Sequence, residues 1–252
     1  MRRKVLRVMM VAIFFALLPC VAQAGSEAIS AALAHPAREV DRADDANRKP
    51  GEVLDFVGVE PGMRVLDLLA GGGYYTEILS RVVGNEGSVI FHNNAAYRQF
   101  LGEALAKRTA GSRLPNVEVL DDEVADLEFE AGELDAVMFV LGFHDIYYKD
   151  DGWPDIDGEE LLAVLYRGLC AGGLLGVVDH SAIDGADALD SGTNLHRIDE
   201  AFTRRTIEAA GFVLDDESDI LRNAADDRSI QVLDASIRRK TDRFVLLFRK
   251  PS

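Results

Sequence analysis

The sequence has 252 residues, of which 48% are hydrophobic, 28% charged and 8% aromatic, a composition that excludes disordered and collagen-like chains. Its 27 lysines and arginines are outnumbered by 43 aspartates and glutamates, which gives a formal charge of −16. We therefore expect no nucleic-acid partner and no attraction to an anionic membrane, because both require clustered cations.

The first 24 residues have the pattern of a secretory signal peptide. Four basic residues are followed by an apolar run from Val8 to Leu18 and by the small-residue segment Ala22-Gln23-Ala24. The run is too short to span a bilayer comfortably. We predict cleavage after Ala24, a periplasmic or secreted location, and no stable membrane insertion of the mature chain.

The rest of the chain divides into an arm and one domain. Residues 25–50 are rich in alanine and charge and predict an N-terminal helical arm that ends at Pro50. In residues 51–252, apolar runs alternate with helical stretches. The predicted strands are 64–68, 87–91, 116–120, 134–140, 173–178, 212–214 and 243–248. This pattern predicts an α/β fold: a doubly wound, mostly parallel seven-stranded sheet with helices on both faces and a C-terminal antiparallel hairpin.

Three consecutive glycines, Gly71 to Gly73, separate the first predicted strand from a helix. Glycine allows the backbone to turn tightly beneath a ligand without side chains in the way. A dinucleotide-binding fingerprint would require a further glycine at position 76, which is Thr76. The turn therefore disfavours NAD; a turn without any ligand is the alternative interpretation.

The acidic residue before this turn, the turn itself and the final hairpin together resemble the class I S-adenosylmethionine-dependent methyltransferases, which have a Rossmann-like fold. The family turn reads Asp/Glu-x-Gly-x-Gly-x-Gly; here Asp67 is followed by Leu69 in place of the first glycine, then by Gly71 and Gly73. Several segments look more narrowly like a group of exported bacterial predicted methyltransferases. These are Arg48-Lys49-Pro50, residues 67–76, Phe143-His144-Asp145, Asp179-His180-Ser181 and residues 195–199.

The resemblance implies S-adenosylmethionine as the cofactor and assigns residues to it. The turn contributes Asp67, Leu69, Ala70, Gly71, Gly73 and Tyr74. The acidic residue that binds the ribose in the family is replaced here by Asn93, which can accept one hydrogen bond and donate another or act only as a turn residue. Asp122 or Glu123 occupies the place of the acidic residue near the adenine, unless both simply lie in a solvated loop.

Candidate catalytic residues follow two strands that are neighbours in this fold. His144 and Asp145 follow the fourth predicted strand, and Asp179 and His180 end the fifth. His144, neutral near pH 7, is a candidate general base. Alternatively, Asp145 and Asp179 hold a divalent cation, as in the catechol-type methyltransferases they resemble, or the pairs only close loops. No zinc-type Cys/His spacing occurs, and we assign no metal site.

Other residues carry weaker hypotheses. The aromatic loop that contains Tyr147, Tyr148 and Trp153 is a candidate substrate contact. The cations of the arm either lie across the cofactor carboxylate or form salt bridges to the acidic body. His196 and Arg197 are predicted to start a helix and to be structural.

Two functions follow from these patterns. The first is a methyltransferase acting on a small molecule or an envelope component. The alternative is a non-catalytic periplasmic ligand-binding protein on a methyltransferase-like scaffold, which Leu69, Asn93 and the export signal favour. A hydrolase is disfavoured because no Gly-x-Ser-x-Gly elbow is present. No pattern indicates an oligomeric state.

Overall fold

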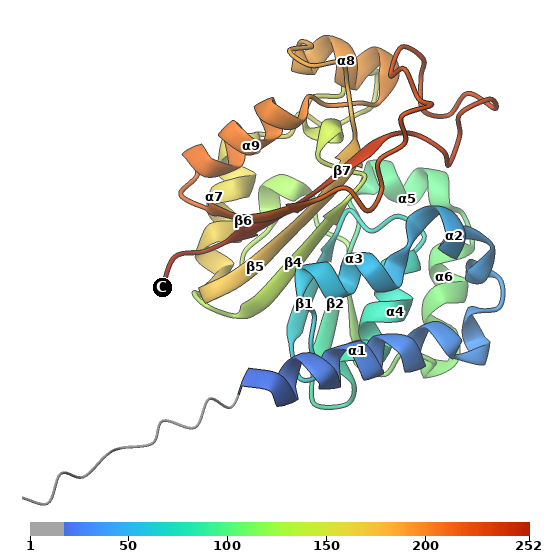
Figure 1. Ribbon diagram of the computed structural model, residues 1–252, viewed down its shortest axis with the longest axis vertical. Helices are drawn as coiled ribbons and strands as arrows, with labels where there is room; N and C mark the ends of the chain where they lie inside the picture. The colour runs from blue at the N-terminus through green and yellow to red at the C-terminus, as the bar shows by residue number, and fades with distance from the viewer. Residues whose placement is uncertain (1–17) are drawn as a thin grey trace, which may run out of the picture.

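A seven-stranded sheet runs through the computed structural model, which describes residues 18–252 (Figure 1). Its strand order is β3-β2-β1-β4-β5-β7-β6, and only β7 runs antiparallel to its neighbours. The strands are β1 (Arg64–Leu68), β2 (Ser88–His92), β3 (Val117–Leu120), β4 (Leu134–Val140), β5 (Leu169–His180), β6 (Val213–Ser218) and β7 (Arg243–Arg249). The predicted parallel sheet and closing hairpin are confirmed.

Successive residues of a strand point to opposite faces of the sheet, and in the inner strands the residues on both faces are apolar. A layer of helices therefore covers each face. One face packs against α1 (Leu18–Ala34), α3 (Pro50–Val57) and α4 (Tyr74–Val83). The other packs against α7 (Gly158–Gly168) and α9 (Glu200–Ala209). In β1, for example, Val65 belongs to the first core and Leu66 to the second, and both are fully buried.

The N-terminal arm is more broken than predicted. After α1, the chain forms two short 3-10 turns, Pro36–Arg38 and Asp41–Asp44, and then α2 (Asp45–Arg48). The prediction that Pro50 ends a helix is wrong. Pro50 begins α3, where the missing N–H of proline costs no hydrogen bond. Between α2 and α3, Lys49 adopts a left-handed conformation with φ 42°.

The predicted cleavage point after Ala24 lies inside α1, and residues 1–17 of the predicted signal lie outside the described residues. The buried residues Ile29 and Ala32, through which α1 packs, both follow that point. Among the residues that the structure describes, no helix combines the length and the apolar character needed to cross a membrane.

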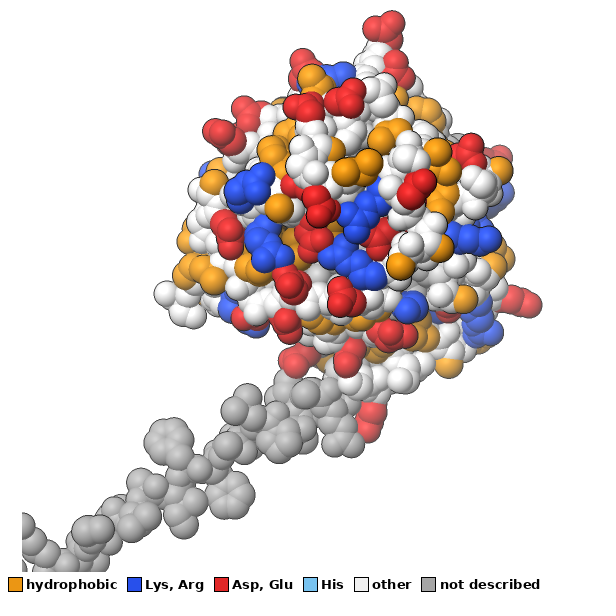
Figure 2. Space-filling model, turned by 45° about the horizontal axis from the view of Figure 1, so that its top comes forward, with side chains coloured by type: hydrophobic (Ala, Val, Ile, Leu, Met, Phe, Trp, Pro, Cys, Tyr) orange, Lys and Arg blue, Asp and Glu red, His pale blue; other side chains and the backbone are white. Residues whose placement is uncertain are grey.

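The carboxyl ends of the parallel strands meet connecting segments at one edge of the sheet. These segments include α5 (Ala95–Leu101), α6 (Ala104–Thr109), the 3-10 turn His144–Ile146 and α8 (Ala188–Leu195). The view from above this part of the molecule shows Lys and Arg side chains interspersed with Asp and Glu (Figure 2). The candidate site lies at this edge.

Candidate active site

The glycine turn keeps a left-handed backbone at all three alternate positions of the family pattern. The φ angles are 48° at Leu69, 57° at Gly71 and 73° at Gly73. Leu69, in place of the first glycine, is 2% exposed, and its N–H donates to Nδ1 of His92 at 3.4 Å. A left-handed leucine costs about 1–2 kcal/mol, which the surrounding packing offsets. The turn therefore retains its shape without the first glycine.

One side of the turn is closed and the other is open. A Cβ on Gly73 would lie 2.9 Å from Cζ of Phe91, so that position is packed against β2. A Cβ on Gly71 or Gly72 would meet no atom within 4 Å. The backbone of these two residues is thus accessible to a ligand, as the cofactor of the resembled family requires.

Asp67 lies beneath the turn and fixes the start of α4. Its carboxylate accepts a hydrogen bond from Oγ1 of Thr76 at 2.6 Å, and the side chain is buried. Burial raises the pKa of Asp67 to about 7, and the hydrogen bonds from Thr76 oppose this shift only in part. The structure therefore shows Asp67 supporting the turn from below.

Asn93, the predicted ribose contact, already uses both ends of its amide within the protein. Its Oδ1 accepts from the N–H of Gly71 at 2.8 Å, and its Nδ2 donates to the carbonyl of Gly71 at 3.0 Å. His92 bridges the same region, since its Nε2 lies 3.0 Å from the carbonyl oxygen of Asp122. Both side chains tie β2 to the turn.

The two acidic residues predicted near the adenine differ in their contacts. Oε1 of Glu123 accepts from the backbone N–H of Ala95 at the start of α5, at 3.0 Å. The carboxylate of Asp122 is exposed, and no hydrogen bond or ion pair engages it within residues 18–252. Of the pair, Asp122 is the one that is free to meet a ligand.

Tyr74 faces the arm. Its hydroxyl donates to Oδ1 of Asp45 at 2.6 Å, and the guanidinium carbon of Arg48 lies 4.6 Å from its ring centroid. The Tyr75 hydroxyl donates to the carbonyl of Arg48 at 3.5 Å. Tyr74, predicted at the cofactor, thus joins the turn to the arm.

The salt bridges between the arm and the body join acidic residues of the arm to arginines of the body, whereas the sequence predicted cations of the arm and acids of the body. Arm acids pair with cations of the body: Asp41 with Arg108 at 2.6 Å and Asp44 with Arg239 at 2.9 Å. The arm cation Arg38 pairs within the arm itself, with Asp45 at 2.7 Å. The carboxylates of the arm thus form these ion pairs with the body, and the arm cation Lys49 contacts the body through the carbonyl of Ile220 at 2.7 Å.

The ends of β4 and β5 bring the predicted catalytic residues together. The backbone N–H of His144 donates to Oδ2 of Asp179 at 2.8 Å, and its Nδ1 lies 2.8 Å from Oδ1 of the same residue. Its Nε2 lies 3.3 Å from Oδ1 of Asp145. Burial opposes a charged imidazole, but the two carboxylates outweigh it and raise the pKa of His144 to about 9.

This geometry bears on the roles expected for the cluster. The raised pKa favours the protonated form of His144 at neutral pH, whereas the general-base hypothesis requires the neutral form. Asp179 is fully buried, and its oxygens accept from the backbone N–H groups of His144 and His180 and contact Nδ1 of His144. The general-base and metal-ligand roles of these residues stay predictions. Burial and the nearby cationic His144 and Arg243 lower the pKa of His180 well below its ordinary value, so this ring is neutral.

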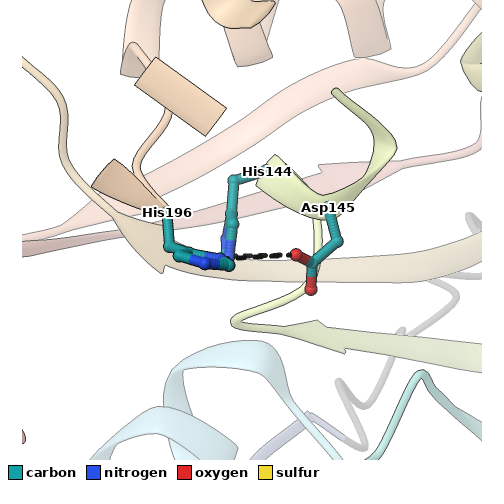
Figure 3. A group of neighbouring side chains, drawn as sticks. All are labelled: His144, Asp145 and His196. Carbon is teal, nitrogen blue, oxygen red and sulfur yellow. Dashed lines mark ion pairs between the residues drawn. The ribbon is translucent and has the colours of Figure 1, made fainter. Parts of the chain in front are cut away.

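His196 is the cluster member that was predicted to be only structural. It does not start a helix but follows α8 in a left-handed conformation, φ 52°. Its Nδ1 lies 3.8 Å from Oδ1 of Asp145 (Figure 3). Its ring stacks on that of Tyr148, with the ring centroids 4.7 Å apart. An isolated β-bridge between Ser181 and Ile198 holds this segment next to the end of β5. The only signal in the sequence was the resemblance of residues 195–199.

Asp145 lies beside the adjacent rings of His144 and His196 (Figure 3). One ligand atom from each of His144, Asp145 and His196 lies within 4.8 Å of the others, a spacing that a metal ion could bridge. The hydroxyl of Tyr97 also donates to Oδ2 of Asp145 at 2.5 Å. Burial works against the charge, but His144, His196 and Tyr97 together lower the pKa of Asp145, which is an anion at neutral pH.

A cavity of about 570 Å³ connects this cluster to the glycine turn. Asp145 and His196 lie on its wall, and so does Gly71. Its aromatic lining consists of Tyr97, Phe100, Tyr148 and Trp153. Tyr148 and Trp153 thus line the cavity, as the aromatic-loop hypothesis requires.

Comparisons with known proteins add a family context. The family model of protein-L-isoaspartate(D-aspartate) O-methyltransferase (PCMT) matches residues 46–106. The chain is 28% identical over 130 residues to the ubiquinone/menaquinone biosynthesis C-methyltransferase UbiE of Ectopseudomonas mendocina, covering 51% of this chain and 46% of that protein. The UbiE protein of Azotobacter vinelandii is 25% identical over 175 residues, 69% of this chain and 61% of its own. The chain thus spans about half the length of the first of these curated relatives.

Solved structures share the architecture at low sequence identity. A SAM-dependent methyltransferase from Aquifex aeolicus superimposes with a TM-score of 0.59 at 19% identity, covering 85% of this chain and 98% of that one. The [4+2]-cyclase SpnF superimposes with a TM-score of 0.55 at 17% identity, covering 82% of this chain and 81% of that one. The chain therefore has the fold of the class I S-adenosylmethionine-dependent methyltransferases, as predicted, and residues 46–106 match a methyltransferase family.

Proposed function

We propose that this protein is an S-adenosylmethionine-dependent methyltransferase acting on a small aromatic molecule that carries an ionisable hydroxyl. One observation carries the proposal: a single cavity joins the open side of the glycine turn at Gly71 to Asp145 and His196. A cofactor over the turn and an acceptor in the cavity would lie in contact with each other. The matches to methyltransferases support the same reaction.

The residues of the turn fit the cofactor, which supplies an electrophilic methyl group when bound. The backbone of Gly71 and Gly72 offers an unobstructed surface, and the free carboxylate of Asp122 can accept from an adenine amino group. Asn93 acts indirectly, by holding Gly71 in place through two hydrogen bonds.

The acceptor must lose a proton as it is methylated, and His196 is the group that takes it. Its imidazole is partly exposed, lies on the cavity wall and is close to the Asp145 carboxylate, which orients it. His144, held as a cation between Asp145 and Asp179, keeps Asp145 ionised. His144 and Asp179 are thus positioning residues, and Asp145 and His196 face the substrate.

The lining of the cavity indicates the class of acceptor. Tyr97, Phe100, Tyr148 and Trp153 favour a flat, apolar ring, while Asp150 and Asp151 disfavour an anion. The curated relatives are named as C-methyltransferases of ubiquinone and menaquinone biosynthesis, and quinones are flat ring compounds, which is consistent with a ring-bearing acceptor. An envelope component remains within this class if it carries such a ring.

We also propose that the chain is exported and cleaved after Ala24. The basic, apolar and small-residue segments support this, and the buried packing residues Ile29 and Ala32 of α1 lie beyond the cleavage point. N-terminal sequencing of the protein from fractionated cells should find Gly25 as the first residue in the extracytoplasmic fraction. An intact Met1 in the cytoplasmic fraction would contradict the proposal.

Calorimetric titration of the full chain with S-adenosylmethionine and S-adenosylhomocysteine tests the cofactor. Gly72→Ala should weaken binding roughly tenfold, because the new methyl group enters the open side of the turn, while stability stays within about 0.5 kcal/mol. Gly73→Ala is the contrasting variant, since its Cβ meets Phe91 at 2.9 Å and should lower the melting temperature instead.

Activity is then measured as transfer of a labelled methyl group to a panel of phenols. Transfer that requires both the cofactor and His196 supports the proposal. Absence of nucleoside binding by the folded protein would overturn it and favour the non-catalytic ligand-binding protein.

A further inference from the structure

Two arginines near the glycine turn, the buried Arg243 and the half-buried Arg48, have no carboxylate partner among the residues that the structure describes. Arg38 and Arg197 are fully buried, and each forms a two-point ion pair, with Asp45 and Asp226 respectively. Arg243 is only 7% exposed, yet within the described residues it has no ion pair. Its Nε is buried without a hydrogen-bond partner, and one terminal nitrogen donates to the carbonyl of Asn47 at 2.5 Å.

Arg48, which follows Asn47, is the second of these cations. Its guanidinium stacks on the ring of Tyr74, 4.6 Å from the centroid, and no carboxylate lies within ion-pair distance of it in residues 18–252. In a chain with 43 acidic residues against 27 basic ones, the absence of a counter-ion at both arginines is unusual. Burial lowers the pKa of Arg243 and the nearby charge of Arg48 lowers it further, and these effects outweigh the opposing ones of Tyr75 and Asp242.

Arg48 lies at the N-terminus of α4, a ten-residue helix that begins at Tyr74 directly after the turn. Arg243 is close enough to Tyr75, in the first turn of that helix, for its charge to oppose the burial that raises the pKa of the Tyr75 hydroxyl. Arg48 contacts Tyr74, and its carbonyl accepts from the Tyr75 hydroxyl. Arg243 begins β7 and pairs in register with His180 of β5. The helix N-terminus adds the partial positive charge of its dipole to that of the two guanidinium groups. This arrangement favours an anion, and guanidinium groups suit a carboxylate.

We propose that Arg48 and Arg243 form a carboxylate-binding subsite, which takes the α-carboxylate of the methionine part of the cofactor. The inference rests on the proposed function, and it specifies which residues hold the end of the cofactor farthest from the adenine. A ligand that lies along Gly71 and Gly72 passes directly to Tyr74 and thus to Arg48. The arm thereby contributes a ligand-binding residue, in addition to covering the turn.

The test compares two nucleosides by calorimetry on the full chain. S-adenosylhomocysteine carries the amino-acid carboxylate, whereas 5′-methylthioadenosine has the same adenosine and a thioether sulfur but no carboxylate. Arg48→Met should weaken binding of the first roughly 10- to 100-fold and leave binding of the second unchanged. Arg48→Lys, which keeps a charge, should lose less. Arg243→Met should give the same selective loss if it folds.

Arg42→Met is the matched control. Arg42 belongs to the same arm, but its guanidinium donates to the carbonyls of Ala34 and His35 and not to a residue of the turn or of α4. Its replacement should change the affinity for neither nucleoside, and the melting temperature of each variant reports any loss of folding.

The outcomes separate this inference from the proposed function. Equal weakening of both nucleosides by Arg48→Met would overturn the carboxylate subsite and leave the cofactor intact. Binding of neither nucleoside to the unmodified protein would overturn both. Titration with benzoate identifies the other source of a carboxylate: if Arg48→Met abolishes a benzoate-induced rise in melting temperature but leaves S-adenosylhomocysteine binding unchanged, the subsite belongs to the methyl acceptor and the inference is wrong.

Discussion

The two halves of the carboxyl edge of the sheet use their polar side chains in opposite ways. At the end of β1, Asp67 is hydrogen-bonded to Thr76, and after β2, Asn93 is hydrogen-bonded to the backbone of Gly71. The surface that remains for a ligand there is mostly backbone. At the ends of β4 and β5, charged groups are held against one another beside a cavity. The first half fixes the shape of the glycine turn, and the second keeps His144, Asp145 and Asp179 charged.

Two aspartates illustrate the difference. Burial raises the pKa of Asp67 to about 7, because only hydrogen bonds from Thr76 and a distant cation oppose it. Asp145 is also buried, yet the adjacent His144 and the other groups around it lower its pKa. The same residue type is thus kept near its neutral form in one half and ionised in the other, which is how a protein separates a structural carboxyl from a reactive one.

The largest effect is expected from removing the proton acceptor of the second half. His196→Asn should reduce turnover by about 100- to 10,000-fold, the usual contribution of a general base. Asparagine tolerates the left-handed conformation of this position, φ 52°, so folding should be preserved. Methyl transfer to a phenol and the melting temperature are measured together. Unchanged turnover in a folded variant would remove His196 from the mechanism.

The next largest effect is expected on stability, when the buried ion pair of His144 and Asp179 is broken. Asp179→Ala leaves the His144 cation without the carboxylate that it contacts at 2.8 Å, and we expect a loss of about 3–5 kcal/mol in the free energy of unfolding. Asp184→Ala is the control, because Asp184 pairs with Arg228 through an exposed carboxylate and should change stability little. Equal, small losses in urea denaturation of both variants would contradict the charge-holding role of the second half.

The smallest effect is the pH dependence that follows from His144. Its pKa is about 9 in the folded state against 6.5 for the free side chain, so its stabilisation is complete below pH 6.5 and is lost as the pH rises through 9. Between pH 7 and 9 the free energy of unfolding should fall by at most about 1.4 kcal/mol per pH unit.

His144→Gln should flatten this alkaline slope. His180, whose pKa is lowered, acts in the other direction and below pH 6.5, where its stabilisation is lost as the pH falls. Urea denaturation at successive pH values distinguishes the two. An alkaline slope that is identical in His144→Gln would show that another group titrates there.

Much of the fold was predictable because the inner strands are apolar on both faces. The exceptions are at the edge: β6 continues to Ser218 through polar residues, since pairing with β7 requires only backbone groups. Pro50 was read as a stop although proline is equally suited to the first turn of a helix, where α3 begins.

The candidate site was predictable only in part. The neighbouring ends of β4 and β5 placed His144 and Asp179 together, because strand order follows from the fold. His196 comes from a distant segment whose approach depends on a single bridge between Ser181 and Ile198, which no local pattern encodes. The protonation of His144 likewise depends on distances to two carboxylates, and these exist only in the folded chain.

The position of β7 has a consequence for how the molecule is made. This strand is the last in sequence, yet it lies inside the sheet, between β5 and β6. A ribosome delivers it after every other strand, and until then β5 and β6 each expose an unpaired edge. The sheet therefore cannot close during synthesis of the preceding residues. A chain captured by a translocation channel before Arg243–Arg249 emerges has no finished sheet to unfold.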